Sequence, residues 1–474
     1  MPPKRKPAAI TASMFFKYDA CPHWLYFDRF GDPKKKLKTS RFTEMLLEMG
    51  LVHEKKVIGA QEYVEVKAKG NDAKFKATLE LMRDGAPRIY QGVLMHGDMV
   101  GKPDILERRD DHRSKFGPYY YAAIDIKSAE RLSDAHRYQL VFYGELLKEI
   151  QGFRPADGYI LNAEGVLVGF PLREFEQQFH EAFTEVRAIL SGKCPPPHLT
   201  SGCKQSPWFE ECKRLAKKTK DIALIYNVKQ KTLEILRQHG IKSLDDAADL
   251  DARRLHESEP TLSLHTLERI RLQARSLIEN RYEIRRPIEL PSAETEIFFD
   301  IEGDPLRQVE YLFGFLERRG GTERYLDFLA ERPEEEGRMW ADFLGWIETL
   351  PPGYVVYHYG TYEQSKLASL ERRYGGTAGL EQFRESMIDL NEIVKKCLVF
   401  PLYFYGIKDI GGYIGFKRSK KISGGGESVA YYEEWLDTHD RRKLEAIMTY
   451  NEDDVVATRF LKDWLADLPK EDAR

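Results

Sequence analysis

Residues 296–304 read EIFFDIEGD, an apolar run that predicts a β-strand with acidic side chains inside it. Side chains two positions apart in a strand leave on the same face, so we expect Asp300 and Glu302 to lie side by side. Two like charges on one buried face repel each other unless a cation compensates them. The stretch therefore predicts a buried strand that carries a metal-binding pair of carboxylates.

The sequence around this strand predicts an α/β domain over residues 286–474. VEYLFGFLE and PPGYVVYHYG are typical of strands, and helical patterns occupy 334–349, 362–374 and 442–465. SGGGES at 423–428 is typical of a mobile loop. In the last helix, TYNEDDVVATRFL places Tyr450 and Asp454 four residues apart, so a phenol and a carboxylate share one helical face.

This arrangement resembles the DnaQ-like 3′–5′ exonucleases of ribonuclease-H-like fold, and most of all their YprB-type group. The resemblance covers about 294–465 and includes IKDIGGYIGF at 407–416. It implies that Asp300, Glu302 and Asp454 hold two divalent ions and that Tyr450 orients the nucleophile. Glu363, in YHYGTYEQSKL, stands where these enzymes carry an Asp and is the fourth expected ligand. Its alternative role is that of a first-turn glutamate favoured by the helix dipole.

Residues 1–215 predict another mixed α/β domain, with helices near 41–59, 134–150 and 173–191 and strand-like runs near 62–67, 90–105 and 119–127. YYYAAIDIKSAE, at 119–130, places Asp125 and Lys127 on one face of a strand. They are either a compensated ion pair or a metal ligand beside a water-activating cation. Asp104 in GKPDIL and His53 in GLVHEKKVI complete a set of oxygen and imidazole ligands that suits Mg²⁺ or Mn²⁺.

Downstream, QLVFY places Gln139 and Tyr143 on one helical face. The ordered set resembles the RecB-like branch of the PD-(D/E)xK nuclease superfamily over roughly 10–215, which implies a restriction-endonuclease-like α/β core. By that resemblance His53, Asp104 and Asp125 hold the metal and Lys127 positions or activates the attacking water. Gln139 and Tyr143 would support the site and the nucleic-acid strand.

The five cysteines are an odd number in a large chain without a secretory signal, so disulfides explain them poorly. RecB-like nucleases often bind a [4Fe–4S] cluster through one early and three late cysteines. Cys21 fits the first position and Cys203 and Cys212 fit two others in GCKQSPWFEEC, but the middle position is Ser206. Either Cys194 replaces the missing ligand, or the cluster is lost and the remaining cysteines are buried thiols or a zinc remnant.

Residues 216–285 predict a small helical domain. IYNVKQKTLEILRQHGI resembles a helix-hairpin-helix, with Asn227-Val228-Lys229 in place of the usual Gly-Val-Gly. Lys229 is expected to contact a nucleic-acid phosphate, although a purely structural hairpin remains the alternative. RRPIELPSAE, at 285–294, is typical of a linker.

The order of these parts resembles bacterial RecB-like nucleases with a ribonuclease-H-like C-terminal domain. The chain of 474 residues has 73 Lys plus Arg against 76 Asp plus Glu, which excludes a uniformly basic coating protein. We expect a metal-dependent nuclease acting on nucleic acid, with DNA bearing single strands or free ends as the expected substrate. The alternative is a nucleic-acid-binding adaptor with one or both sites decayed. A sugar or nucleotide enzyme is least favoured because no Gly-rich phosphate fingerprint is present. No apolar run approaches a membrane span, so a cytoplasmic protein is expected.

Overall fold

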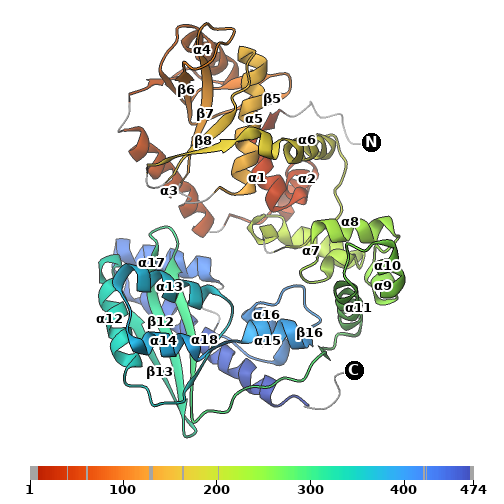
Figure 1. The fold of residues 1–474 in the computed structure, drawn as a ribbon, viewed down its shortest axis with the longest axis vertical. Helices are drawn as coiled ribbons and strands as arrows, with labels where there is room; N and C mark the ends of the chain where they lie inside the picture. The colour runs from red at the N-terminus through yellow and green to blue at the C-terminus, as the bar shows by residue number, and fades with distance from the viewer. Residues whose placement is uncertain are drawn as a thin grey trace. The chain divides into compact units, whose positions relative to one another are not determined.

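The computed structural model describes residues 9–39, 41–59, 62–127, 132–162, 165–200, 202–419, 422 and 424–469. The chain forms two compact units, Met1–Leu215 and Ala216–Arg474 (Figure 1). Both are mixed α/β structures, as expected. The further division at residue 285 stays a prediction.

The first unit contains a six-stranded mixed sheet of order β2-β3-β6-β7-β8-β9 and a small sheet of order β1-β5-β4. The run over 90–105 is divided among several strands by turns, one of which contains Gly97 at φ 58°. The strands are β1 (Ile10–Thr11), β2 (Val64–Glu65), β3 (Arg88–Tyr90), β4 (Leu94–His96), β5 (Met99–Gly101), β6 (Ile105–Arg109), β7 (Tyr120–Ile126), β8 (Asp157–Leu161) and β9 (Leu167–Pro171). The α-helices are α1 (Ala12–Ala20), α2 (Pro22–Phe30), α3 (Arg41–Ile58), α4 (Asn71–Arg83), α5 (Asp134–Gln151) and α6 (Glu176–Leu190).

Strand β7 is buried along its whole length, and its two faces belong to different cores. Tyr121 and Ala123 pack with Phe142 of α5. Ile124 and Ile126 pack in the other core, which includes Ile58 of α3. Because side chains alternate along a strand, Asp125 leaves on the same face as Tyr121 and Ala123, toward α5.

The second unit begins with helices, as the sequence predicts. Helix α7 (Phe209–Lys218) runs across the boundary between the units. The helices that follow are α8 (Gln230–Gln238), α9 (Leu244–Ala248), α10 (Ala252–Ser258) and α11 (Leu264–Glu279). Asn227, before α8, has φ 56°, a left-handed conformation that Asn adopts more readily than most residues.

A five-stranded mixed sheet of order β13-β12-β11-β14-β15 forms the rest of this unit. The strands are β11 (Thr295–Asp304), β12 (Val309–Arg319), β13 (Thr322–Leu329), β14 (Val355–His358) and β15 (Met387–Asp389), and a separate pair joins β10 (Glu283–Ile284) to β16 (Leu398–Val399). The helices are α12 (Glu336–Ile347), α13 (Tyr362–Tyr374), α14 (Ala378–Glu385), α15 (Leu390–Cys397), α16 (Ile407–Ile414), α17 (Gly425–Thr438) and α18 (Arg441–Ala466).

Strand β11 separates the two cores of this sheet by simple alternation. Ile297, Phe299 and Ile301 pack with apolar side chains of α12, α13 and α14. Phe298 points to the opposite face and packs with side chains of α15, α16 and α18. Asp300 and Glu302 lie two and four positions after Phe298, so they share its face of the strand and point toward α18.

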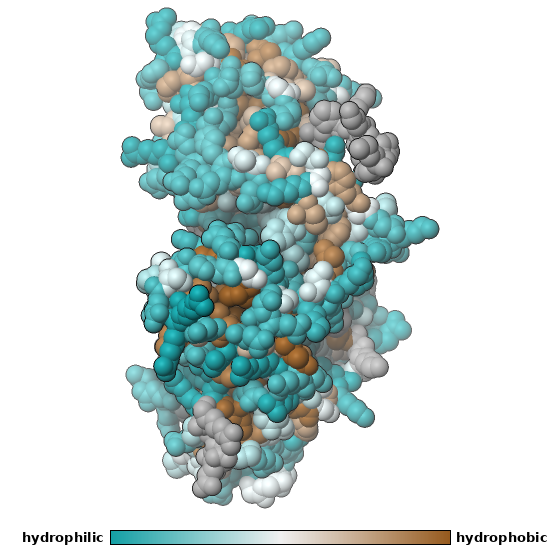
Figure 2. All heavy atoms as spheres, turned by 90° about the vertical axis from the view of Figure 1, so that its right-hand side faces the viewer, coloured by the Kyte–Doolittle hydropathy of each residue, from teal (hydrophilic) through white to brown (hydrophobic). Residues whose placement is uncertain are grey.

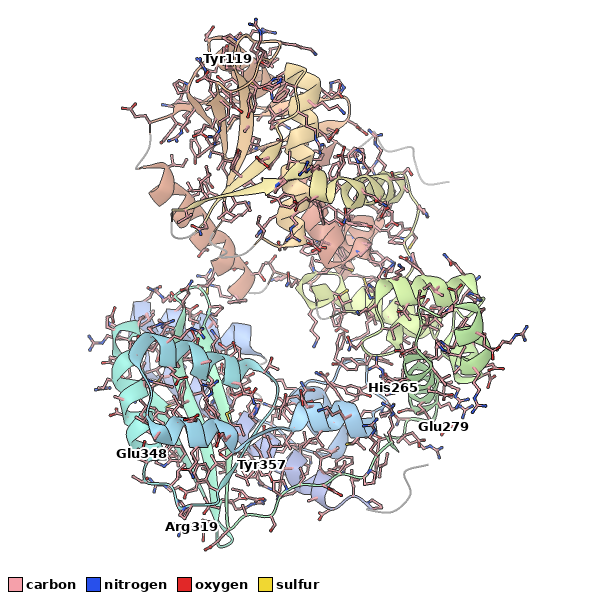
Figure 3. The ribbon with its side chains drawn as sticks, viewed as in Figure 1. Tyr119, His265, Glu279, Arg319, Glu348 and Tyr357 are labelled. Atoms are coloured by element: carbon pink, nitrogen blue, oxygen red, sulfur yellow. The ribbon has the colours of Figure 1, made fainter. Side chains whose placement is uncertain are left out.

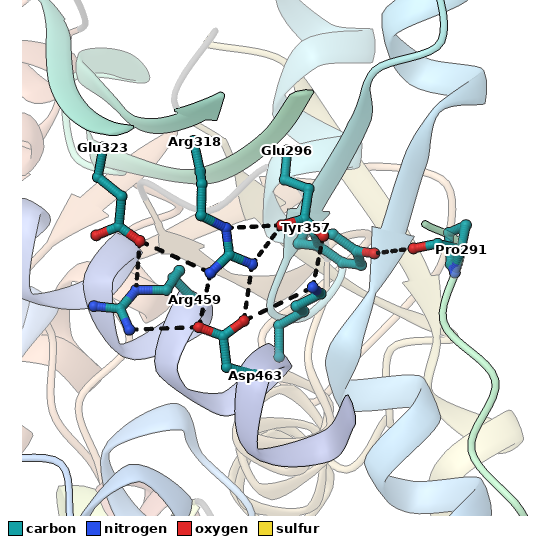
Figure 4. A network of polar contacts seen from close by, with 8 residues as sticks. Pro291, Glu296, Arg318, Glu323, Tyr357, Arg459 and Asp463 are labelled. Atoms are coloured by element: carbon teal, nitrogen blue, oxygen red, sulfur yellow. Dashed lines mark hydrogen bonds and ion pairs between the residues drawn. The ribbon is translucent and has the colours of Figure 1, made fainter. Parts of the chain in front are cut away.

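A network of ion pairs fixes α18 to the sheet (Figure 4). Arg318 of β12 donates to both oxygens of Asp463 on α18 at 2.8 Å each, and its Nε donates to Glu296 of β11 at 2.8 Å. Lys462 pairs with the same Glu296 at 2.6 Å. Because a two-pronged Arg–carboxylate pair fixes orientation as well as distance, this network sets the position of α18 over β11.

The prediction of a mobile loop at SGGGES is wrong for residues 425–428, since α17 begins at Gly425. Ser428 is buried there, with its hydroxyl 2.7 Å from that of Tyr311, so tertiary packing overrides the weak helix propensity of glycine. Among the described residues, no helix is long and apolar enough to cross a membrane. Hydrophilic residues cover most of the face that Figure 2 shows.

Gly314 of β12 allows α18 to approach the sheet closely, and we expect Gly314→Ala to destabilise the second unit. A Cβ there would lie 1.5 Å from Oδ1 of Asn451 on α18. Overpacking of this kind costs about 1–3 kcal/mol. Thermal unfolding measures the effect. Gly345→Ala on α12 is the control, because its Cβ meets nothing within 4 Å and should leave stability equal or higher. Equal unfolding temperatures for wild type and Gly314→Ala would contradict the prediction.

Candidate active sites

In the second unit, three buried carboxylates come together where β11 meets α18. Oxygen atoms of Asp300, Glu302 and Asp454 all lie within 4.8 Å of one another. Tyr450, one turn before Asp454, hydrogen-bonds to it. The expected meeting of a strand pair with a helical carboxylate and phenol is therefore present.

The neighbours of this carboxylate triad, Asp300, Glu302 and Asp454, hold it in place. Nδ2 of Asn451 donates to Oδ2 of Asp300 at 2.9 Å, and Ser428 hydrogen-bonds to Glu302. Burial, followed by the charge of Asp454, raises the pKa of Asp300 well above its ordinary value and that of Glu302 to about 8. Three gathered carboxylates, of which Asp300 and Glu302 have raised pKa values, form a set that fits a divalent cation.

Glu363 lies beside the triad without being one of its three members. It is the first-turn glutamate of α13, buried, and its charge contributes to the raised pKa values of Asp300 and Glu302. Its Oε2 lies 3.4 Å from Nδ1 of the buried His358, and this contact partly offsets the burial that raises the pKa of Glu363. A buried carboxylate of raised pKa beside the triad fits a ligand position for a second cation.

Two cations that the sequence analysis did not single out lie against the triad. Arg418 pairs with Asp454, and its segment is held by Ser419, whose N–H and hydroxyl both donate to Asp453. The charge of Lys408 acts on Asp454, Glu302 and Asp300, and its Nζ lies 4.4 Å from the ring centroid of Tyr450. Lys408 stands in IKDIGGYIGF, so this motif could have identified it as a residue of the site. Arg418 stands in no motif that the sequence analysis used.

The raised pKa of Glu302 predicts how metal-free stability depends on pH. The pKa of a glutamate is about 4.3 in the unfolded chain, and that of Glu302 rises to about 8 on folding. Between these two pH values the native state therefore binds more protons than the unfolded state. The corresponding stabilisation is present below the unfolded pKa and is lost as pH rises through about 8. In EDTA, we therefore expect the unfolding temperature of wild type to fall relative to that of Glu302→Gln between pH 5 and 9. Parallel pH profiles of the two proteins would contradict this prediction.

In the first unit, the expected residues line one cavity of about 300 Å³: Asp104, Asp125, Lys127, Gln139 and Tyr143. Nζ of Lys127 lies 3.2 Å from Oδ2 of Asp125. Oδ2 of Asp104 accepts the N–H of Ile126 at 2.7 Å, which ties this carboxylate to the end of β7. The hydroxyl of Tyr143 donates to the carbonyl of Lys102 at 3.2 Å.

The electrostatics of this cavity resemble those of the triad. Burial, followed by the charge of Asp125, raises the pKa of Asp104 to about 7. Burial lowers the pKa of Lys127, but the charges of Asp125 and Asp104 outweigh it, so this pKa is raised overall. An ammonium beside two carboxylates fits a site that holds a divalent ion and a phosphate together.

Helix α3 supplies a further group near this cavity. His53 lies on α3, but its side chain is outside the described part of the chain. The neighbouring Glu54 accepts from the hydroxyl of Tyr90 at 2.8 Å, and its charge contributes to the raised pKa of Asp104. The sequence analysis also missed Thr11, Ser13 and Lys102, which line the cavity. Lys102 stands in GKPDIL, so that motif was a signal for it, whereas Thr11 and Ser13 stand in no motif.

The cysteines do not fit a [4Fe–4S] cluster, which needs four thiolates. The buried Cys21 hydrogen-bonds to both Cys203 and Cys212. The bond to Cys203 lowers the pKa of Cys21, but the bond to Cys212 and burial outweigh it and raise this pKa to about 12. Ser206 uses its hydroxyl to accept the N–H of Trp208 at 3.2 Å. Cys194 is exposed, with Sγ 3.8 Å from Nε2 of His23, so the structure gives no support for its replacing the missing ligand. Within the described residues, no cysteine belongs to a group of metal-ligating side chains within 4.8 Å of one another.

The hairpin residue Lys229 is exposed and precedes α8 as its N-cap. The preceding residue, Val228, is buried. Exposure fits both the phosphate-binding and the purely structural interpretation, so the role of Lys229 stays a prediction.

A sheet whose central strand and last helix bring three buried carboxylates together defines an α/β domain with a candidate metal site. Residues 297–466 match the RNase_H_2 model of the RNase_H superfamily. The C-terminal part of the chain is therefore an RNase H-like domain. No curated protein matches the chain.

Proposed function

We propose that this protein is a metal-dependent nuclease with two sites. The observation that carries the proposal is the buried triad Asp300, Glu302 and Asp454 inside a domain that matches the RNase_H superfamily. The N-terminal cavity supports a second site of RecB-like type, because its aspartates and lysine lie within one pocket.

In the C-terminal site, Asp300, Glu302 and Asp454 hold divalent Mg²⁺ or Mn²⁺, with Glu363 as the fourth ligand. Bound ions of this kind activate a water and neutralise charge on the reacting phosphate. Tyr450 orients that water through its hydroxyl, which is held by Asp454. Arg418 and Lys408 neutralise the carboxylates when no ion is bound, and they pair with substrate phosphate when the carboxylates hold ions.

In the N-terminal site, Asp104 and Asp125 hold the divalent ion together with His53. Lys127 positions or activates the attacking water and pairs with the scissile phosphate. Gln139 and Tyr143 keep the cavity in shape and border the strand. The substrate we propose is nucleic acid, and in particular DNA with single strands or free ends.

The test is cleavage of end-labelled single- and double-stranded DNA and RNA by the purified chain in Mg²⁺, Mn²⁺ or EDTA. We expect cleavage in either metal and none in EDTA. Binding without cleavage in every metal would overturn the nuclease proposal in favour of an adaptor with decayed sites.

A further inference from the structure

Three arginines and a histidine gather at the start of α11 and just after β10, within the second unit. They are His265, Arg269, Arg285 and Arg286. Nη2 of Arg285 lies 3.4 Å from Nδ1 of His265, and Nη2 of Arg269 donates to the carbonyl of Asn227 at 3.2 Å. Figure 3 labels His265 and Glu279 at opposite ends of α11.

The backbone holds two of these arginines firmly in place. The N–H groups of Arg285 and Arg286 both donate to the carbonyl of Cys397, at 2.7 and 3.4 Å. The strand pair β10–β16 lies directly beside these bonds. The two guanidinium groups therefore start from fixed positions on neighbouring residues.

No carboxylate compensates this cluster within the described structure. None of the salt bridges there includes His265, Arg269, Arg285 or Arg286. Nearby Arg281, by contrast, pairs with Glu279 at 2.6 Å and with Glu283 at 3.0 Å. Acidic side chains are thus close in sequence but are bound to a different arginine.

The arginines of this cluster repel one another. Burial, followed by the charges of Arg269 and Arg286, lowers the pKa of Arg285. Burial and the three arginines lower the pKa of His265. Among the largest contributions to the pKa of Arg285, the opposing ones come from the thiol of Cys397 and the phenol of Tyr405. Like charges gathered in this way destabilise the free protein and are relieved by a bound polyanion.

Guanidinium groups are suited to phosphate because their planar donors match two of its oxygens at once. His265 also stands in the first turn of α11, where the helix dipole favours an anion. We propose that His265, Arg269, Arg285 and Arg286 form a surface that binds successive phosphates of a nucleic-acid backbone, separate from both carboxylate sites. This inference rests on the proposed function only in taking nucleic acid as the substrate.

The test measures binding rather than cleavage. A fluorescein-labelled 20-nucleotide single strand is titrated in EDTA at several salt concentrations and followed by anisotropy. For Arg285→Gln/Arg286→Gln we expect Kd to weaken about tenfold or more at low salt. The magnitude of the salt slope should fall by about 1.4, since each phosphate contact to a single strand contributes about 0.7.

Arg253→Gln/Arg254→Gln is the matched control, because it removes the same charge from neighbouring exposed arginines of α10. We expect this control to change Kd and the salt slope far less. The test variant should unfold at the same or a higher temperature than wild type, which separates lost contacts from lost folding. Equal Kd values and slopes for the two double variants would overturn the proposed surface. Binding through these arginines by a chain that cleaves nothing would uphold the surface and overturn only the nuclease proposal.

Discussion

Asp300→Asn should reduce cleavage by the C-terminal site on the order of 10³-fold, the scale of losing a central charged group of an active site. The amide keeps the shape of Asp300 and can still accept from Asn451, but it removes one negative ligand from the triad. Cleavage is measured in a Lys127→Met background, so that the N-terminal site contributes little.

The same variant should be more stable than its parent in EDTA, because one of three mutually repelling buried carboxylates is gone. It should also lose most of the stabilisation by metal, which for a single site reaches about 2.7 kcal/mol at 100 times Kd. Asp327→Asn is the control. It makes the same substitution on β13 of the same sheet, outside the triad, and should preserve both cleavage and metal stabilisation. Undiminished cleavage by Asp300→Asn, with unchanged metal stabilisation, would remove the site from this domain.

Lys127→Met should reduce cleavage by the N-terminal site on the order of 10²–10³-fold, measured in an Asp300→Asn background. Nζ of Lys127 lies 3.2 Å from Asp125, and its charge lowers the pKa of Asp104. Its removal leaves both carboxylates without a cation, so Asp104 should hold its proton to higher pH and bind metal less well near neutrality. The pH profile of any residual activity should therefore shift upward.

Lys148→Met is the matched control, because Lys148 is a partly exposed lysine of α5 that pairs with Glu145 outside the cavity. It should cleave like its parent. Lys127→Arg should recover part of the activity if charge is what the site needs. Equal cleavage by the Lys127→Met and Lys148→Met proteins would show that the cavity is not a nuclease site.

The sequence was a good guide wherever a short-range period carried the information. Alternation along β11 places Asp300 and Glu302 on one face, and helical spacing places Tyr450 beside Asp454 on α18. The same reasoning places Asp125 and Lys127 together on β7 and its end. Local geometry determines these pairs, because residues two apart in a strand or four apart in a helix share a face in any fold.

Spacing alone could not show which separate elements meet. The union of β11 with α18 depends on a close approach at Gly314 and on the two-pronged bond between Arg318 and Asp463. These contacts join residues more than a hundred positions apart, so no local pattern reports them. Arg418 and Asp454 are only 36 positions apart, but their contact also joins separate segments and has no counterpart in any motif.

Local sequence therefore accounts for the carboxylate pairs, the helical segment and the α/β character of both units. Tertiary packing decided that Glu363 lies beside the triad with His358, that Cys194 faces solvent and that SGGGES leads into a helix. It also brought Arg269 to the neighbourhood of Arg285 and Arg286, where no salt bridge to a carboxylate is present among the described residues. The physical reason is that periodicity orients a side chain relative to its own element, whereas burial and charge pairing depend on which other elements pack against it.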